Sequence, residues 1–256
     1  MRTDVLETSE DAVLGGRLRL RQLLAGHRVG HDAILLAAAT AALSGECAID
    51  LGAGVGAAGL ALAVRVAGLK VTLVEIDAAL CALAADNARL NNLADRVSVL
   101  AADAADAAAL AAAGISPGGA DRVLMNPPFH DATRQNLSPD PHRRLAYAAA
   151  PGLLPRWVAS AAQLLKPQGV LTLIWRADAL AAVQHALVAE FGAIAVLPVL
   201  PRPEAPPVRV LVRAVKSGSG APVTYPGLIL NDPHGKPTAA AEAVLRGGGT
   251  LSITET

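Results

Sequence analysis

Four consecutive residues have the side chains and backbone restrictions needed to activate an amine: Asn126-Pro127-Pro128-Phe129, directly after the apolar segment 122–125. The exocyclic amine of adenine is a poor nucleophile because its lone pair is delocalised into the ring. The Asn126 side-chain oxygen and the Pro127 carbonyl could each accept one amine hydrogen and stabilise the positive charge that develops on nitrogen. The prolines fix φ and leave no competing backbone donor. Phe129 could stack on a flat base, which is worth about 1–3 kcal/mol. A rigid turn with a buried Phe129 is the alternative.

A glycine-rich segment at 48–56 precedes this tetrapeptide in the chain, with glycines at 52, 54 and 56. Glycines let the backbone approach a ligand closely and expose the N-terminus of the following helix. A NAD-binding protein would show nearly the same pattern, so the glycines by themselves predict only a nucleotide-like ligand.

Three acidic residues narrow the choice of ligand. Asp50 precedes the first glycine, Glu75 ends the next expected strand roughly 20 residues past the loop, and Asp103 ends the third. Such acids can accept hydrogen bonds from ribose hydroxyls and an adenine amine, and they balance a sulfonium and an ammonium better than they suit a pyrophosphate. They therefore predict S-adenosyl-L-methionine as cofactor. In the alternatives, Asp50 binds loop amides, Glu75 is a solvated acid, and Asp103 caps a helix.

The elements that must position these residues alternate along the chain. Apolar, β-branched runs predict strands at 47–51, 70–76, 96–100, 122–125, 170–175, 194–200 and 208–215. Helical patterns lie between them at 56–66, 78–90, 104–113, 153–165 and 179–191. Strands joined by helices form parallel sheets covered on both faces. We predict an α/β fold with a mostly parallel seven-stranded sheet, helices on both faces, and an antiparallel strand at one end.

The two ends of the chain add small elements. A hairpin is expected at 13–21 around the Gly15-Gly16 turn, with leucines inward and arginines outward. A helix follows at 32–43 with Asp32 as its N-cap, and a strand and helix are expected at 228–230 and 237–245. The predicted division is residues 1–45 over the cofactor site, 46–216 as the catalytic domain, and 217–256 as a C-terminal extension.

Composition limits the class of protein. The 256 residues are 53% hydrophobic and only 2% aromatic, with no net charge, so a large core of Ala, Leu and Val is expected. Both cysteines, Cys47 and Cys81, are predicted to be buried apolar side chains, with a reactive thiol as the alternative. The sequence shows no membrane span and no signal-peptide pattern, so we expect a cytoplasmic protein.

Taken together, these motifs resemble the class I, Rossmann-like methyltransferases of the small methyltransferase domain group, and most of all the bacterial tRNA(Val) adenine-N6 methyltransferases. The resemblance covers nearly the whole chain and is carried by residues 28–36, 50–56, 75–77, 126–129 and 209–212. It implies that Arg28 and Asp32 lie near the methionine end of the cofactor. The alternative is that Arg28 is a surface residue and Asp32 only a helix cap.

The predicted site follows from the residues and the resemblance together. The candidate catalytic residues are Asn126, Pro127, Pro128 and Phe129. The candidate cofactor-binding residues are Arg28, Asp32, Asp50, Gly52, Ala53, Gly54, Gly56, Glu75, Ile76, Asp103, Ala104 and Asn126. No metal site is expected.

RNA, most of all tRNA, is the expected partner. Arginines that could meet phosphates occur in three groups: Arg17, Arg19 and Arg21; Arg134, Arg143 and Arg144; and Arg202, Arg209, Arg213 and Lys216. The neutral total charge neither favours nor excludes nucleic acid. Alternative activities are guanine-N2 methylation of ribosomal RNA, glutamine methylation of protein, and a non-catalytic cofactor-binding module. A dehydrogenase is disfavoured, because Asn-Pro-Pro-Phe has no role in hydride transfer.

Overall fold

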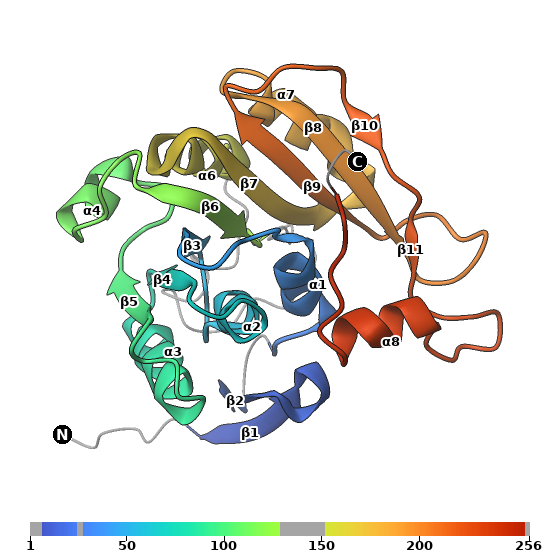
Figure 1. The fold of residues 1–256 in the computed structure, drawn as a ribbon, viewed down its shortest axis with the longest axis horizontal. Coiled ribbons are helices and arrows are strands. Elements are labelled where there is room, and N and C mark those ends of the chain that lie inside the picture. The colour runs from blue at the N-terminus through green and yellow to red at the C-terminus, as the bar shows by residue number, and fades with distance from the viewer. Residues whose placement is uncertain (1–6, 25–27, 129–151, 254–256) are drawn as a thin grey trace.

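The computed structural model describes residues 7–24, 28–128 and 152–253. Its main sheet has the order β10-β8-β9-β7-β6-β3-β4-β5, with β11 also paired to β8 (Figure 1). The strands are β3 (Cys47–Leu51), β4 (Lys70–Glu75), β5 (Val97–Ala101), β6 (Ala120–Met125), β7 (Leu165–Arg176), β8 (Phe191–Leu200), β9 (Arg209–Lys216), β10 (Val223–Thr224) and β11 (Leu228–Ile229). The predicted Rossmann-like sheet is confirmed, and the two-residue strands β10 and β11 extend it from seven strands to nine.

The antiparallel strand is internal, so the expectation that it lies at one end of the sheet was wrong. β9 pairs antiparallel with β7 on one side and with β8 on the other. The chain first crosses from β7 to β8 and then returns through β9 between them. The outer edge of β8 is in turn covered by β10 and β11, which pair with it in parallel.

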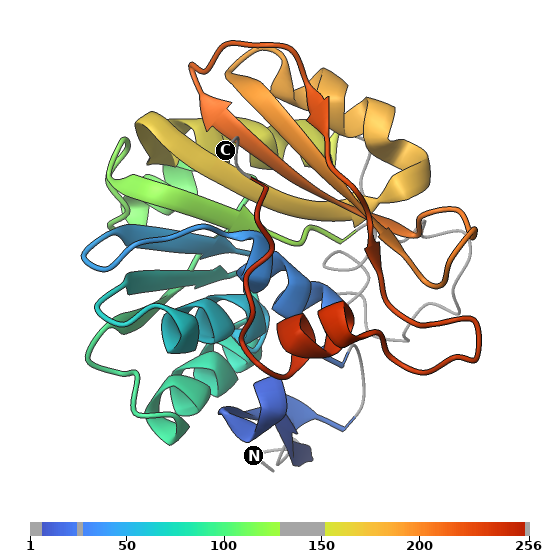
Figure 2. The ribbon, with the colours of Figure 1, turned by 45° about the vertical axis from the view of Figure 1, so that its right-hand side comes forward.

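Helices cover both faces of the sheet (Figure 2). One layer contains α1 (His31–Ala39), α2 (Ala57–Arg65), α3 (Ala78–Leu90) and α8 (Ala239–Leu245). The other contains α4 (Ala107–Ala112), α6 (Leu153–Leu164) and α7 (Leu180–Leu187). Successive strand residues point to opposite faces, so Ala48 and Leu73 join the first core while Ile49 and Val74 join the second.

The N-terminal hairpin lies against the first helical layer. It consists of β1 (Thr8–Val13) and β2 (Leu18–Leu23), joined by the short 3-10 turn η1 (Leu14–Gly16). Leu18 and Leu20 are fully buried while Arg19 and Arg21 are exposed, which confirms the predicted alternation. Arg17 lies in the turn rather than on the strand.

Helix α1 differs from the prediction at both ends. Its N-cap is Gly30, so Asp32 lies within the first turn and does not cap the helix. The helix ends at Ala39 rather than at residue 43. At the next residue, Thr40, the backbone becomes extended and the side-chain hydroxyl donates to the Leu36 carbonyl at 2.8 Å. None of the helices in the described ranges is long and apolar enough to cross a membrane.

Candidate cofactor and amine site

Strand register places the predicted site residues along the carboxyl edge of the sheet. Leu51 at the end of β3 lies opposite Met125 of β6 and Val74 of β4, and Glu75 lies opposite Ala101 of β5. The residues that follow these strand ends are therefore neighbours. The chain leaves β3 through α2 towards β4, whereas β6 lies on the other side of β3. Such a topological switch point is where open α/β sheets bind ligands.

The glycine loop after β3 uses its three glycines in different ways. Gly52, Gly54 and Gly56 have φ of +69°, +58° and +87°, a region that favours glycine. A Cβ on Gly52 would lie 2.2 Å from the Trp157 ring, and one on Gly56 would lie 2.9 Å from Leu73. A Cβ on Gly54 would meet no atom of the described residues within 4 Å. Packing therefore requires two of the glycines, while the third faces open space that a ligand could enter.

Asp50 lies beneath this loop, on the face covered by α2. Its side chain is buried, and Oδ2 accepts a hydrogen bond from the Gly59 N–H at 2.8 Å. Burial raises the pKa of Asp50 to about 7; the nearby Glu75 charge adds to this and the Gly59 hydrogen bond opposes it. Asp50 thus accepts from a backbone amide of α2. This contact is similar to the alternative interpretation, in which Asp50 binds amides of the loop.

Glu75 is fixed by three backbone amides. Its Oε2 accepts from the Gly54 N–H at 2.8 Å, and its Oε1 accepts from Ile76 at 2.8 Å and Asp77 at 2.9 Å. The carboxylate is buried, so Glu75 is not a solvated loop acid. The neighbouring Ile76 is 59% exposed, which leaves an apolar surface beside the loop.

Asp103 follows β5 and accepts a hydrogen bond from the Ala105 N–H at 2.8 Å. It does not cap the next helix, because α4 begins at Ala107 and its N-cap is Asp106. The alternative for Asp103 as a helix cap was therefore wrong. Ala104 beside it is buried.

Asn126 begins the segment after β6, next to the glycine loop. Its Oδ1 is buried and has no hydrogen-bond partner among the described residues. A buried acceptor without a partner costs about 1–3 kcal/mol, so such atoms point to a missing ligand or water. Pro127 is buried and Pro128 half-buried, whereas Phe129 lies outside the described residues.

Sequence reasoning missed Trp157, which α6 places against the glycine loop at Gly52. Its indole Nε1 is also buried without a partner in the described part of the chain. The chain has only two tryptophans. This scarcity was the one available indication, and it did not show which loop the ring would contact.

Arg28 and Asp32 both have partners within the protein. Arg28 forms an ion pair with Asp11 of the hairpin at 2.7 Å, and Asp32 forms one with Arg209 of β9 at 2.9 Å. Their predicted place at the methionine end of the cofactor stays a prediction.

The predicted basic groups are dispersed or paired. Arg19 and Arg21 both pair with Glu10. Arg209 and Lys216 occupy opposite ends of β9, roughly 23 Å apart at the rise of a strand, so they do not form one cluster. The third predicted group, Arg134, Arg143 and Arg144, lies outside the described residues.

The cysteines are half-buried rather than fully buried. The Cys81 thiol donates to the Glu75 carbonyl at 3.3 Å. Burial and the charges of Glu75 and Asp77 raise the pKa of Cys81, which disfavours the thiolate and so argues against a reactive thiol. No metal-binding group of three His, Cys, Asp or Glu side chains occurs within residues 7–24, 28–128 and 152–253.

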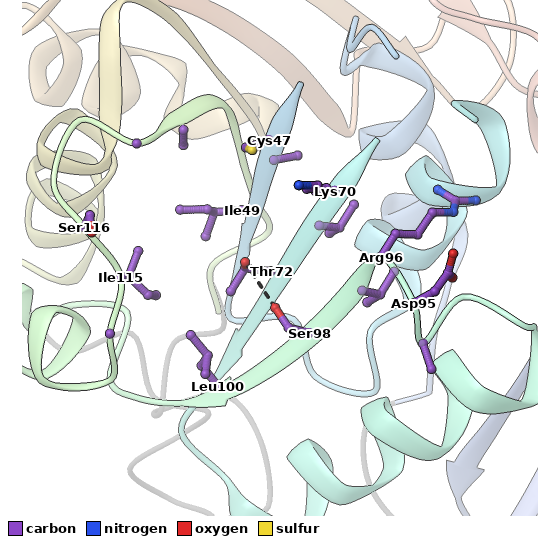
Figure 3. Close-up of a pocket in the computed structure, with 17 residues that line it drawn as sticks. Cys47, Ile49, Lys70, Thr72, Asp95, Arg96, Ser98, Leu100, Ile115 and Ser116 are labelled. Carbon is purple, nitrogen blue, oxygen red and sulfur yellow. Dashed lines mark hydrogen bonds between the residues drawn. The ribbon is translucent and has the colours of Figure 1, made fainter. Parts of the chain in front are cut away.

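A separate cavity of about 490 Å³ opens at the other end of the sheet (Figure 3). Its lining includes the amino ends of β3 to β6, where the Thr72 and Ser98 hydroxyls lie 3.3 Å apart. None of the predicted cofactor or catalytic residues lines this cavity, so it is distinct from the candidate site.

Comparison with known proteins agrees with this architecture. The crystal structure of a predicted O-methyltransferase, Atu636 from Agrobacterium tumefaciens, has a TM-score of 0.74 and 28% identity, with 88% of this chain and 100% of that one covered. A Thermus thermophilus 16S rRNA N2 G1207 methyltransferase, in complex with AdoMet and guanosine, shares the fold at a TM-score of 0.56 and 21% identity, covering 82% of this chain and 50% of that one.

Curated relatives match part of the chain. A tRNA1(Val) (adenine(37)-N6)-methyltransferase of Porphyromonas gingivalis is 32% identical over 158 residues, which are 60% of this chain and 60% of that enzyme. A release factor glutamine methyltransferase of Chlorobaculum tepidum is 30% identical over 155 residues, 58% of this chain and 52% of that enzyme. The chain thus matches little more than half the length of either relative.

The family described as methyltransferase small domain matches residues 27–198, which include the glycine loop, all three strand-end acids and the Asn-Pro-Pro-Phe segment. Within the described part of the chain, the space at Gly54 and the Asn126 Oδ1 that has no hydrogen-bond partner fit a ligand at this edge of the sheet. The chain therefore belongs to the methyltransferase small domain family, whose cofactor is S-adenosyl-L-methionine.

Proposed function

We propose that this enzyme methylates the N6 amine of an adenine in tRNA. The observation that carries the proposal is the buried Asn126 Oδ1, which has no hydrogen-bond partner among the described residues. It lies in the segment that follows β6, beside the glycine loop that follows β3. An acceptor in this position suits a substrate that brings hydrogen-bond donors, as an exocyclic amine does.

The cofactor would lie along the carboxyl edge of the sheet. The proposed contacts are the loop backbone at Gly52 to Gly56 for the methionine part, Glu75 for the ribose, and Asp103 for the adenine amine. The exposed Ile76 side chain offers an apolar surface for the flat base. S-adenosylmethionine, when bound, supplies an electrophilic methyl group and leaves as S-adenosylhomocysteine.

The residues of this chain would act on the acceptor nitrogen. Asn126 Oδ1 and the Pro127 carbonyl each accept one amine hydrogen, which directs the lone pair at the methyl carbon and stabilises the positive charge on nitrogen. Held by the glycine loop, Glu75 and Asp103, the cofactor would supply the methyl group to this nitrogen, and the electron pair of its carbon–sulfur bond would remain on sulfur. The methylated nitrogen then releases its extra proton to water without a strong base.

The choice of adenine in tRNA rests on the similarity to the Porphyromonas gingivalis enzyme together with the Asn-Pro-Pro-Phe segment. A glutamine side-chain amide and the guanine N2 amine present the same kind of donor to Asn126, so both are outcomes that the experiment must separate.

The experiment is methyl transfer from labelled S-adenosylmethionine to tRNA, ribosomal RNA and release factor from cells lacking this enzyme. Label in N6-methyladenosine of tRNA is the expected result. Label in N2-methylguanosine or in a protein glutamine would replace the proposed substrate, and label in an oxygen-linked methyl group would reject amine activation.

Two variants test the role of Asn126. Asn126→Ala removes the acceptor oxygen and should lower kcat about 100- to 1,000-fold, the range for loss of one preorganised polar contact, while S-adenosylhomocysteine affinity changes little. Asn126→Asp keeps an acceptor oxygen in nearly the same place and should lose less activity than Asn126→Ala. Equal losses in the two variants would contradict the acceptor role.

A further inference from the structure

Two asparagines of α3, Asn87 and Asn91, pair with the outer edge of β2 as a neighbouring strand would. Asn87 Oδ1 accepts from the Arg21 N–H at 2.7 Å, and its Nδ2 donates to the Arg21 carbonyl at 3.0 Å. Asn91 makes the same two bonds with Arg19, at 2.9 and 2.7 Å. Four helical residues rise roughly 6 Å and two strand residues roughly 6.6 Å, so the two side chains match alternate residues of β2.

The two asparagines differ in where their remaining amide hydrogen goes. Asn91 Nδ2 donates to the Asn87 carbonyl within α3 at 2.7 Å. Asn87 Nδ2 donates to the Val55 carbonyl at 3.0 Å, and the Asn87 side chain is completely buried. Both residues therefore dock the hairpin, but only Asn87 also holds the glycine loop.

Val55 is a buried residue of the glycine loop, between Gly54 and Gly56. It directly follows Gly54, whose N–H donates to the Glu75 carboxylate at 2.8 Å and whose Cβ position is open. A shift of the Val55 peptide would therefore move the backbone next to the proposed cofactor contacts. Asn87 fixes that peptide from the side of the hairpin.

The hairpin also holds the segment that leads into α1. Gln22 of β2 is buried; its Oε1 accepts from the Val29 N–H at 2.7 Å, and its Nε2 donates to Asp11 at 3.0 Å. Asp11 in turn pairs with Arg28. The hairpin thus connects two segments that both belong to the predicted cofactor site.

We propose that Asn87 is a positioning residue that couples the seating of the β1–β2 hairpin to the geometry of the glycine loop, and thereby to cofactor affinity. The inference rests on the proposed cofactor site. Because coupling between two binding equilibria is reciprocal, cofactor binding must also stabilise the docked hairpin.

The first test compares Asn87→Ala with the matched control Asn91→Ala. Each variant removes two bonds to β2, but only Asn87→Ala also releases Val55. Calorimetric titration with S-adenosylhomocysteine should show Kd at least 10-fold higher for Asn87→Ala and less than 3-fold higher for Asn91→Ala. Equal changes in Kd would overturn the proposal, because they would show that loosening the hairpin alone accounts for the effect.

The second test uses the unaltered protein and so does not depend on whether Asn87→Ala folds. Hydrogen exchange of the Arg19 and Arg21 amides is measured with and without saturating S-adenosylhomocysteine. Binding should slow both amides at least 3-fold. Unchanged exchange in a protein that binds the probe would overturn the coupling alone, whereas failure to bind would overturn the cofactor site and this inference with it.

Discussion

Asp50→Asn should make the stability of this protein less dependent on pH. Residue Asp50 is 2% exposed, and burial raises the pKa of its carboxyl to about 7 from 3.8. Between these values the folded protein keeps a proton that the unfolded chain has lost, so stability falls as pH rises from about 4 to about 7 and then levels off. The shift of about three pKa units corresponds to about 4 kcal/mol lost at pH 8, at about 1.4 kcal/mol per unit.

The asparagine variant keeps the contact and removes the charge. Its side-chain oxygen can still accept from the Gly59 N–H, which Asp50 Oδ2 does at 2.8 Å. The free energy of unfolding of Asp50→Asn should therefore equal that of the natural protein near pH 4 and exceed it by up to about 4 kcal/mol at pH 8.

The assay is urea unfolding of both proteins at intervals from pH 4 to pH 8, compared as a difference so that other titrating groups cancel. Glu75→Gln is the control: because the Glu75 charge is a secondary cause of the shift, this variant should reduce the pH dependence without abolishing it. Difference curves that stay flat from pH 4 to pH 8 would show that Asp50 does not titrate in this range and would refute the reasoning.

Two further predictions concern the glycine loop. Gly54→Ala is compared with the control Gly45→Ala, because both glycines have positive φ and neither Cβ would meet a described atom within 4 Å. Each substitution should cost about 1–2 kcal/mol of stability, but only Gly54→Ala should weaken S-adenosylhomocysteine binding in a calorimetric titration. Equal affinities of the two variants would place the ligand elsewhere. Gly52→Ala puts a Cβ 2.2 Å from the Trp157 ring, so it should cost more stability than Gly54→Ala. It should also shift the tryptophan fluorescence emission. An unshifted emission spectrum would contradict the contact between Gly52 and Trp157.

The sequence was sufficient where the governing interactions are local. The strand Cys47–Leu51 and the helix Ala78–Leu90 have the predicted bounds, because hydrophobic periodicity and the breaks that follow them are written in neighbouring residues. The alternation of strands and helices also predicted the parallel sheet, and parallel strands bring their carboxyl ends to one edge. Asp50, Glu75, Asp103 and Asn126 could therefore be placed along that edge from sequence alone.

Local patterns misplaced several helix ends for the same reason. Asp32 and Asp103 each precede an apolar run and look like N-caps, yet the caps are Gly30 and Asp106. A cap depends on the backbone angles at the helix start, and a suitable side chain two or three residues away fits the pattern equally well.

Only the tertiary structure decided the pairings between distant segments. Arg209 meets Asp32 across 177 residues, and Asn87 meets Arg21 across 66. The insertion of β9 between β7 and β8 likewise depends on which free strand edge the returning chain meets. The sequence by itself predicted most of the elements, the sheet edge proposed for the chemistry, and the family. The structure determined which polar groups satisfy one another there, because burial requires a partner but does not specify where along the chain it comes from.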